Sequence, residues 1–162
     1  MCAVKVTGGA KLDAALARYL DNATLTMRAG ILEGATEPDG LPSALVGFWN
    51  EYGTVRVVDG KVIITPARSF MRSTADAKAA RWAKIVGVTL QRNGGNFDQA
   101  LRLAGEAAVA DIQQTIGTFT IPANAPSTIR KKGFDGPLRG SAQAPMQHAI
   151  AYDIVDGPPD ES

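Results

Sequence analysis

The residue types that most often carry out chemistry in proteins are scarce and scattered in this sequence. His148 is the only histidine and Cys2 the only cysteine, so imidazoles and thiolates cannot supply the three or four ligands of a typical metal site. The acidic residues form no close cluster along the chain, although a fold can still bring distant carboxylates together. The paired glycines at 8–9 and 94–95 lack the Lys-Ser/Thr of a phosphate-binding loop. We therefore expect no enzyme, no metal and no cofactor, and a structural or surface role for His148.

Length and composition favour one globular domain. The chain has 162 residues, of which 45% are hydrophobic and 20% charged. This is enough to bury a core without disulfides, and we expect a single domain over residues 1–156. Within it, about the first nine residues (1–9) are expected to form an extended arm, and 157–162 a frayed tail.

The same sequence argues against membrane and nucleic-acid partners. No apolar run approaches the ~20 residues of a membrane-spanning helix, and the N-terminus lacks the apolar segment of a signal peptide. With one cysteine and no such signals, synthesis in a reducing cytoplasm is expected. The formal net charge is +1, and the densest basic run, at 130–132, is expected to be a solvated turn. We therefore expect no membrane partner and no sequence-specific nucleic acid.

A β-hairpin is the strongest local prediction. Two apolar runs, Thr54–Val58 and Lys61–Thr65, flank Asp59-Gly60. Asp-Gly suits a type I′ turn, because both central residues of that turn need a positive φ. One face of the hairpin could lie on the domain's own core, or the hairpin could project and contact a neighbouring subunit. The candidate interface in the second case is Val55, Arg56, Val57, Val58, Asp59, Gly60, Lys61, Val62, Ile63 and Ile64.

Helices and further strands are predicted around this hairpin. Apolar spacings of three and four predict helices from 10 to about 31, from 75 to 90, and from 97 to 116, the last with Asn96 as its N-cap. The apolar run at 44–50 predicts a strand or the approach to one, and alternation predicts a strand at 148–155. The expected fold class is α+β, with three helices packed on a small antiparallel sheet built from the central hairpin and the C-terminal strand.

Two charged residues flank the hairpin. Glu51 precedes its first strand and Arg68 follows its second, so the hairpin could bring them together at its base. One hypothesis is that they form an ion pair that orients the hairpin relative to the helix beginning near Ser69. The alternative is two separate surface charges.

Three motifs resemble a known family. They are Asn-Glu-Tyr-Gly-Thr at 50–54, Pro-Ala-Arg-Ser-Phe-Met-Arg at 66–72, and the segment 124–155 with its Asn-small-Pro opening, basic turn and Pro-Leu. Together they are similar to the neck or tail-completion proteins of long-tailed bacteriophages. One departure is Arg139-Gly140-Ser141, which stands where that family usually has an Asp-Thr-Gly turn, so the conformation of 139–145 is left open. The positions that carry the resemblance are Asn50, Glu51, Tyr52, Gly53, Pro66, Arg68, Phe70, Pro137 and Leu138.

The resemblance implies a function in virion assembly. Such a protein would be a non-enzymatic structural part, made in the host bacterial cytoplasm and located in the neck or tail of the virion. Its partners would be copies of itself in a ring of six or twelve, a head-completion or connector protein, and a tail terminator or tail tube protein. Two other functions are considered: a small cytosolic adaptor that binds a protein through the same hairpin, and a nuclease with a carboxylate site.

Overall fold

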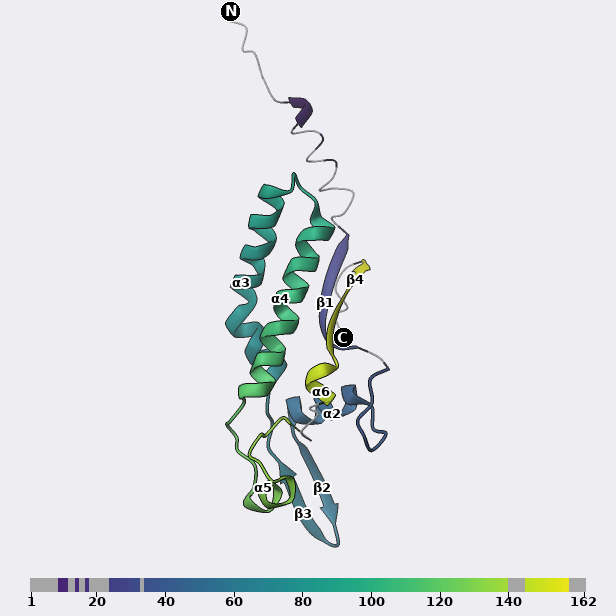
Figure 1. The fold of residues 1–162 in the computed structure, drawn as a ribbon. Coiled ribbons are helices and arrows are strands. Elements are labelled where there is room, and N and C mark those ends of the chain that lie inside the picture. The colour runs from purple at the N-terminus through teal and green to yellow at the C-terminus, as the bar shows by residue number, and fades with distance from the viewer. Residues whose placement is uncertain are drawn as a thin grey trace, which may run out of the picture.

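The computed structural model describes residues 9–11, 14, 17, 24–32, 34–139 and 145–157. The fold is α+β, as the sequence predicts (Figure 1). In chain order the elements are β1 (Leu25–Ile31), α2 (Ser43–Tyr52), β2 (Thr54–Val58), β3 (Lys61–Thr65), α3 (Phe70–Arg92), α4 (Phe97–Thr118), α5 (Pro126–Lys132), α6 (Pro145–His148) and β4 (Ile150–Asp156).

Two long helices, α3 and α4, form the centre of the molecule. They lie side by side as an antiparallel pair joined by the short turn at 93–96 (Figure 1). Asn96 caps α4, because its side chain accepts a hydrogen bond of 3.0 Å from the backbone N–H of Gln99. Both helices and this cap were predicted from the sequence and are confirmed. Six buried residues form the core: Phe70, Ile112, Ile116, Leu138, Met146 and Ile150.

A small sheet packs against α4. β1 pairs with β4 in antiparallel register, with Ile31 opposite Ile150 and Arg28 opposite Asp153. Gly105 of α4 lies directly under the ring of Tyr152, and a Cβ at this position would overlap that ring. Glycine at 105 is therefore what lets α4 approach the sheet so closely.

The expected first helix is wrong at its C-terminal end, because 25–31 is strand β1. Met27 and Ile31 are four residues apart, which fits a helical face, but it also fits the alternation of a strand. The segment forms a strand because it pairs with β4, which lies at least 119 residues later in the chain. Residues 9–11, 14 and 17 are helical. The rest of 1–23, including most of the expected arm, lies outside the described residues.

Three other predictions need correction. The segment 44–50, predicted as a strand or the approach to one, belongs to helix α2. Its apolar residues follow the spacing of a helix. β4 pairs with β1 and not with the hairpin, so β2 and β3 form a sheet of their own, and β4 starts at Ile150, after α6. The basic run at 130–132, predicted as a solvated turn, forms the last turn of helix α5. Residues 140–144 lie outside the described residues.

We expect acid to weaken the pairing of β1 with β4. Arg28 donates hydrogen bonds to Asp153 from Nε (3.1 Å) and Nη2 (2.6 Å), and these lower the pKa of Asp153 below its ordinary value of 3.8. A carboxyl group with a lowered folded-state pKa contributes stability that is fully present above the unfolded pKa. That contribution disappears as the pH falls through the folded pKa.

The test is urea unfolding of the wild type and of Arg28→Gln at several pH values from about 5 down to about 2. The wild type should lose more stability than the variant over this range, and the difference should be small because the pair is exposed to solvent. Parallel pH profiles for the two proteins would contradict the expectation.

Candidate protein-interaction surface

The β2–β3 hairpin has one face made only of exposed apolar side chains. Val55 is opposite Ile64 and Val57 is opposite Val62, and directly opposite residues share a face. The exposed fractions of these four side chains are 71%, 70%, 67% and 63% in that order. We call Val55, Val57, Val62 and Ile64 the apolar face. A soluble domain seldom exposes four β-branched residues side by side unless another molecule covers them.

The opposite face of the hairpin is mixed. It carries Arg56 and Lys61 together with Val58 and Ile63, and all four are exposed. We call this the basic face. The hairpin is therefore amphipathic, although neither of its faces packs extensively against another described helix or strand.

The hairpin projects from one end of the molecule (Figure 1). Its two strands contact each other extensively, but among the described elements neither makes more than a few contacts with any other. Every residue from Val55 to Ile64 is exposed. The hypothesis that one face lies on the domain's own core is therefore wrong, whereas contact with a neighbouring subunit stays a prediction.

Exposed aromatic residues of α2 adjoin the hairpin. The rings of Phe48 and Tyr52 are in tilted contact, with their centroids 4.8 Å apart, and the guanidinium of Arg72 lies 4.8 Å from the centroid of Tyr52. A pocket of about 280 Å³ at the hairpin base is bounded by Trp49, Val55 and neighbouring residues. The exposed large apolar residues in and just before α2 are Leu41, Leu45, Phe48, Trp49 and Tyr52.

Gly53 makes the sharp turn from α2 into β2. Its φ of 76° and ψ of 173° belong to a region that glycine alone populates readily. A Cβ at this position would lie 2.7 Å from the carbonyl oxygen of Thr65 and 2.9 Å from the backbone nitrogen of Ala67. The chain entering the hairpin and the chain leaving it therefore touch at a point where no side chain fits.

Gly53→Ala is accordingly expected to lower the free energy of unfolding by about 1–3 kcal/mol. Gly60→Ala in the hairpin turn is the matched control, because Gly60 also has a positive φ, of 73°, but nothing lies within 4 Å of its Cβ position. Urea unfolding of both variants measures the difference. Equal losses would mean that the close contact at Gly53 contributes nothing.

Glu51 holds the first turn of α3. Its carboxylate is almost fully buried and accepts hydrogen bonds from the backbone N–H of Met71 (3.0 Å), the backbone N–H of Arg72 (3.1 Å) and Arg72 Nε (2.9 Å). A carboxylate is favoured at this end of a helix, because the unpaired N–H groups and the helix dipole are positive there. The ion-pair partner of Glu51 is Arg72, so the predicted pair with Arg68 is wrong.

Arg68 anchors the other end of the hairpin to a different part of the chain. Its backbone N–H donates to the carbonyl of Asn50 (2.6 Å), and its buried guanidinium donates to the carbonyls of Pro122 (3.1 Å) and Ala123 (3.3 Å). Burial lowers the pKa of Arg68, and the negative charge of Asp135 partly opposes that effect. Through these bonds Arg68 ties the end of β3 to the loop before α5.

The remaining motif residues are mostly structural. Phe70 is fully buried, and Leu138 belongs to the same core cluster, with Pro137 buried beside it. Pro66 follows β3 directly and is exposed. Asn50 donates from its side chain to the carbonyl of Val46 (2.9 Å). Glu51, Gly53 and Arg68 therefore fix the base of the hairpin, whereas Phe70, Pro137 and Leu138 belong to the buried interior.

Asp111, a second buried carboxylate, accepts hydrogen bonds from the indole of Trp82 (2.8 Å) and from Arg81, and so joins α4 to α3. Within the described ranges no three His, Cys, Asp or Glu residues are placed to hold a metal ion. No described helix is both long enough and apolar enough to cross a membrane.

Searches against protein-family models, curated proteins and solved structures find no match to this chain.

One part of this surface was not predicted from the sequence. The residues at 41, 45, 48, 49 and 52 recur at helical spacing, which is the signal that 44–50 forms a helix with one apolar side. That side faces solvent beside the hairpin, and it enlarges the surface available to a partner.

Proposed function

We propose that this protein is a non-enzymatic virion subunit of the neck or tail-completion type, which assembles into a ring between the head connector and the tail. The observation that carries the proposal is the apolar face, which no described part of the chain covers. Each buried Val or Ile contributes about 1.5–3 kcal/mol, so covering four of them is a strong drive to associate.

The resemblance of 50–54, 66–72 and 124–155 to the phage family supports the virion setting. In this protein the motif residues Glu51, Gly53 and Arg68 all act at the base of the hairpin. A rigid base with a projecting apolar hairpin suits a subunit that docks on partners already in place. Those partners are further copies of the chain, a head-completion or connector protein, and a tail terminator or tail tube protein.

The proposal is tested by the molar mass of the purified full-length protein, measured by light scattering across a wide concentration range, with negative-stain images of any large species. A ring of six or twelve copies is the expected result. A monomer or dimer at every concentration would overturn the ring and favour the adaptor, which uses the same exposed hairpin with a different stoichiometry.

A further inference from the structure

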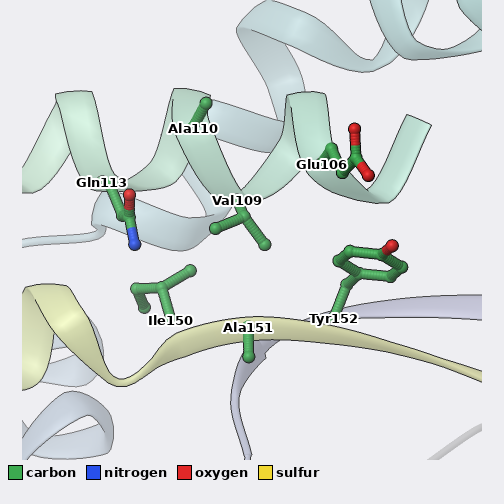
Figure 2. Close-up of a pocket in the computed structure, with 7 residues that line it drawn as sticks. All are labelled: Glu106, Val109, Ala110, Gln113, Ile150, Ala151 and Tyr152. Atoms are coloured by element: carbon green, nitrogen blue, oxygen red, sulfur yellow. The ribbon is translucent and has the colours of Figure 1, made fainter. Parts of the chain in front are cut away.

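A groove runs along the side of the molecule between α4 and β4, with a volume of about 470 Å³. Figure 2 shows Val109 of α4 and Ile150 of β4 pointing toward each other across it, with the ring of Tyr152 near Glu106. Ala110 and Gln113 of α4 complete this wall. No residue of β1 lines the groove, so it lies at the edge of β4 that β1 does not occupy.

This edge of β4 has no strand partner in the described part of the chain, because β1 alone pairs with β4. An open edge presents unpaired N–H and C=O groups that can accept another strand. A strand added here would have one face turned onto α4 and the other turned to the same side as Arg28 and Asp153. The α4 side is apolar, through Val109, Ile150 and Tyr152, whereas the opposite side is charged.

The hairpin has the pattern that such a strand needs. β2 and β3 each have five residues and an outer edge that no other described strand occupies. The apolar face would meet α4, and the basic face would lie on the charged side of the sheet. Directly opposite residues share a face, so β2 and β3 both place apolar residues on one face and the basic residues on the other. Either strand could therefore pair with β4 with its apolar residues turned to α4.

One carboxylate of the β4 edge lies on the side that the basic face of the hairpin would meet. Asp153 lies on the side of the sheet that the basic face would meet, where it pairs with Arg28 of β1. Glu106 and Asp156 lie on the α4 side of the same edge. The hairpin carries Arg56 and Lys61 against Asp59. Neither Arg56 nor Lys61 has an ion-pair partner within the described part of the chain. Their charge has the sign that Asp153 attracts, and the like charges of two basic faces disfavour contact of hairpin with hairpin.

We propose that the hairpin of one copy adds to the free edge of β4 in a second copy, with its apolar face turned onto α4. This inference rests on the self-assembly proposed above and names the surface that receives the hairpin. The hairpin projects from one end of the chain and has no extensive contact with α4 or β4 of its own copy. Hairpin and groove are different surfaces, so the contact is head-to-tail, and repeating it generates a closed ring when the rotation closes.

The test is disulfide formation between single-cysteine variants made in a Cys2→Ser background. One variant carries Val57→Cys or Val62→Cys on the apolar face, and the other carries Ala110→Cys in the groove. All three positions are exposed to solvent. Mixing a hairpin variant with the groove variant under mild oxidation should give a covalent heterodimer within which residue 57 or 62 is linked to residue 110.

Two controls separate this contact from random collision. Ile63→Cys lies on the basic face of the same hairpin and should link to Ala110→Cys much less. Ala83→Cys is an exposed position on α3 and should link to neither hairpin variant. At least a tenfold excess of the 57–110 or 62–110 product over both controls is expected, and yields equal to the controls would overturn the inference.

Light scattering on the wild type separates this result from the proposed function. Rings without the expected cross-link would overturn the groove as the receiving surface and leave self-assembly standing. The cross-link without rings would support the groove and overturn the ring. If neither is found, both proposals fail.

Discussion

Glu51→Ala is expected to lower the free energy of unfolding by about 3–4 kcal/mol, because each partly buried N–H that loses its acceptor costs ~1–3 kcal/mol. The variant leaves the amides of Met71 and Arg72 without their carboxylate, and it removes the negative charge from the start of α3. It also frees Arg72, which otherwise bridges Glu51, Ser69 and the ring of Tyr52. Urea unfolding followed by circular dichroism measures the loss.

Two further variants isolate the cause. Glu51→Gln keeps an oxygen acceptor but loses the charge, so its loss should be smaller than that of Glu51→Ala. Asp76→Ala removes an exposed carboxylate from α3 itself, and a surface substitution of this kind should change stability by no more than about 0.5 kcal/mol. If Glu51→Ala behaved like Asp76→Ala, the carboxylate would not be what holds the first turn of α3.

Val57→Asp/Val62→Asp is expected to abolish assembly and leave the monomer folded. The two side chains face each other across the hairpin and are 67% and 63% exposed, so aspartate there meets water in the free monomer. In an assembly the same carboxylates would replace apolar contacts worth about 1.5–3 kcal/mol each and would themselves lose water. Association should weaken at least a hundredfold, since each ~1.4 kcal/mol is a factor of ten.

Light scattering measures the association, and urea unfolding measures the fold. The matched control is Val58→Asp/Ile63→Asp, which introduces the same charges on the basic face of the same hairpin. This control should weaken assembly less, because it leaves the apolar face intact. Persistence of full-size oligomers in Val57→Asp/Val62→Asp would show that the apolar face is not the contact.

The features that short stretches of sequence encode were predictable. Asp59-Gly60 between two β-branched runs gave the hairpin with the bounds that the structure has. The stop at 93–95 and the cap at Asn96 separated α3 from α4. In each case neighbouring residues decide the backbone conformation, and no distant partner is needed.

Features that depend on distant partners were not predictable. The sequence of β1 also fits the end of a helix, because the spacing of Met27 and Ile31 is compatible with both a helix and a strand. Only the pairing with β4 shows that the segment is a strand. Glu51 could be expected to pair with Arg68, because both flank the hairpin, yet the first turn of α3 offers two amides and a guanidinium in one place. The groove combines residues of α4 and β4 that are about forty residues apart, so no local sequence pattern predicts it.

The Glu51 contact also has a mechanical consequence. Glu51 lies in the last turn of α2, just before the hairpin, and it holds the first turn of α3, just after the hairpin. Arg68 fixes the same base to the loop before α5. A force on the hairpin tip would therefore act on the N-terminal end of α3. This helix has 23 residues and is about 35 Å long, at ~1.5 Å per residue. Because these contacts join the hairpin base to α3, we expect a force applied at the hairpin to be transmitted along this helix.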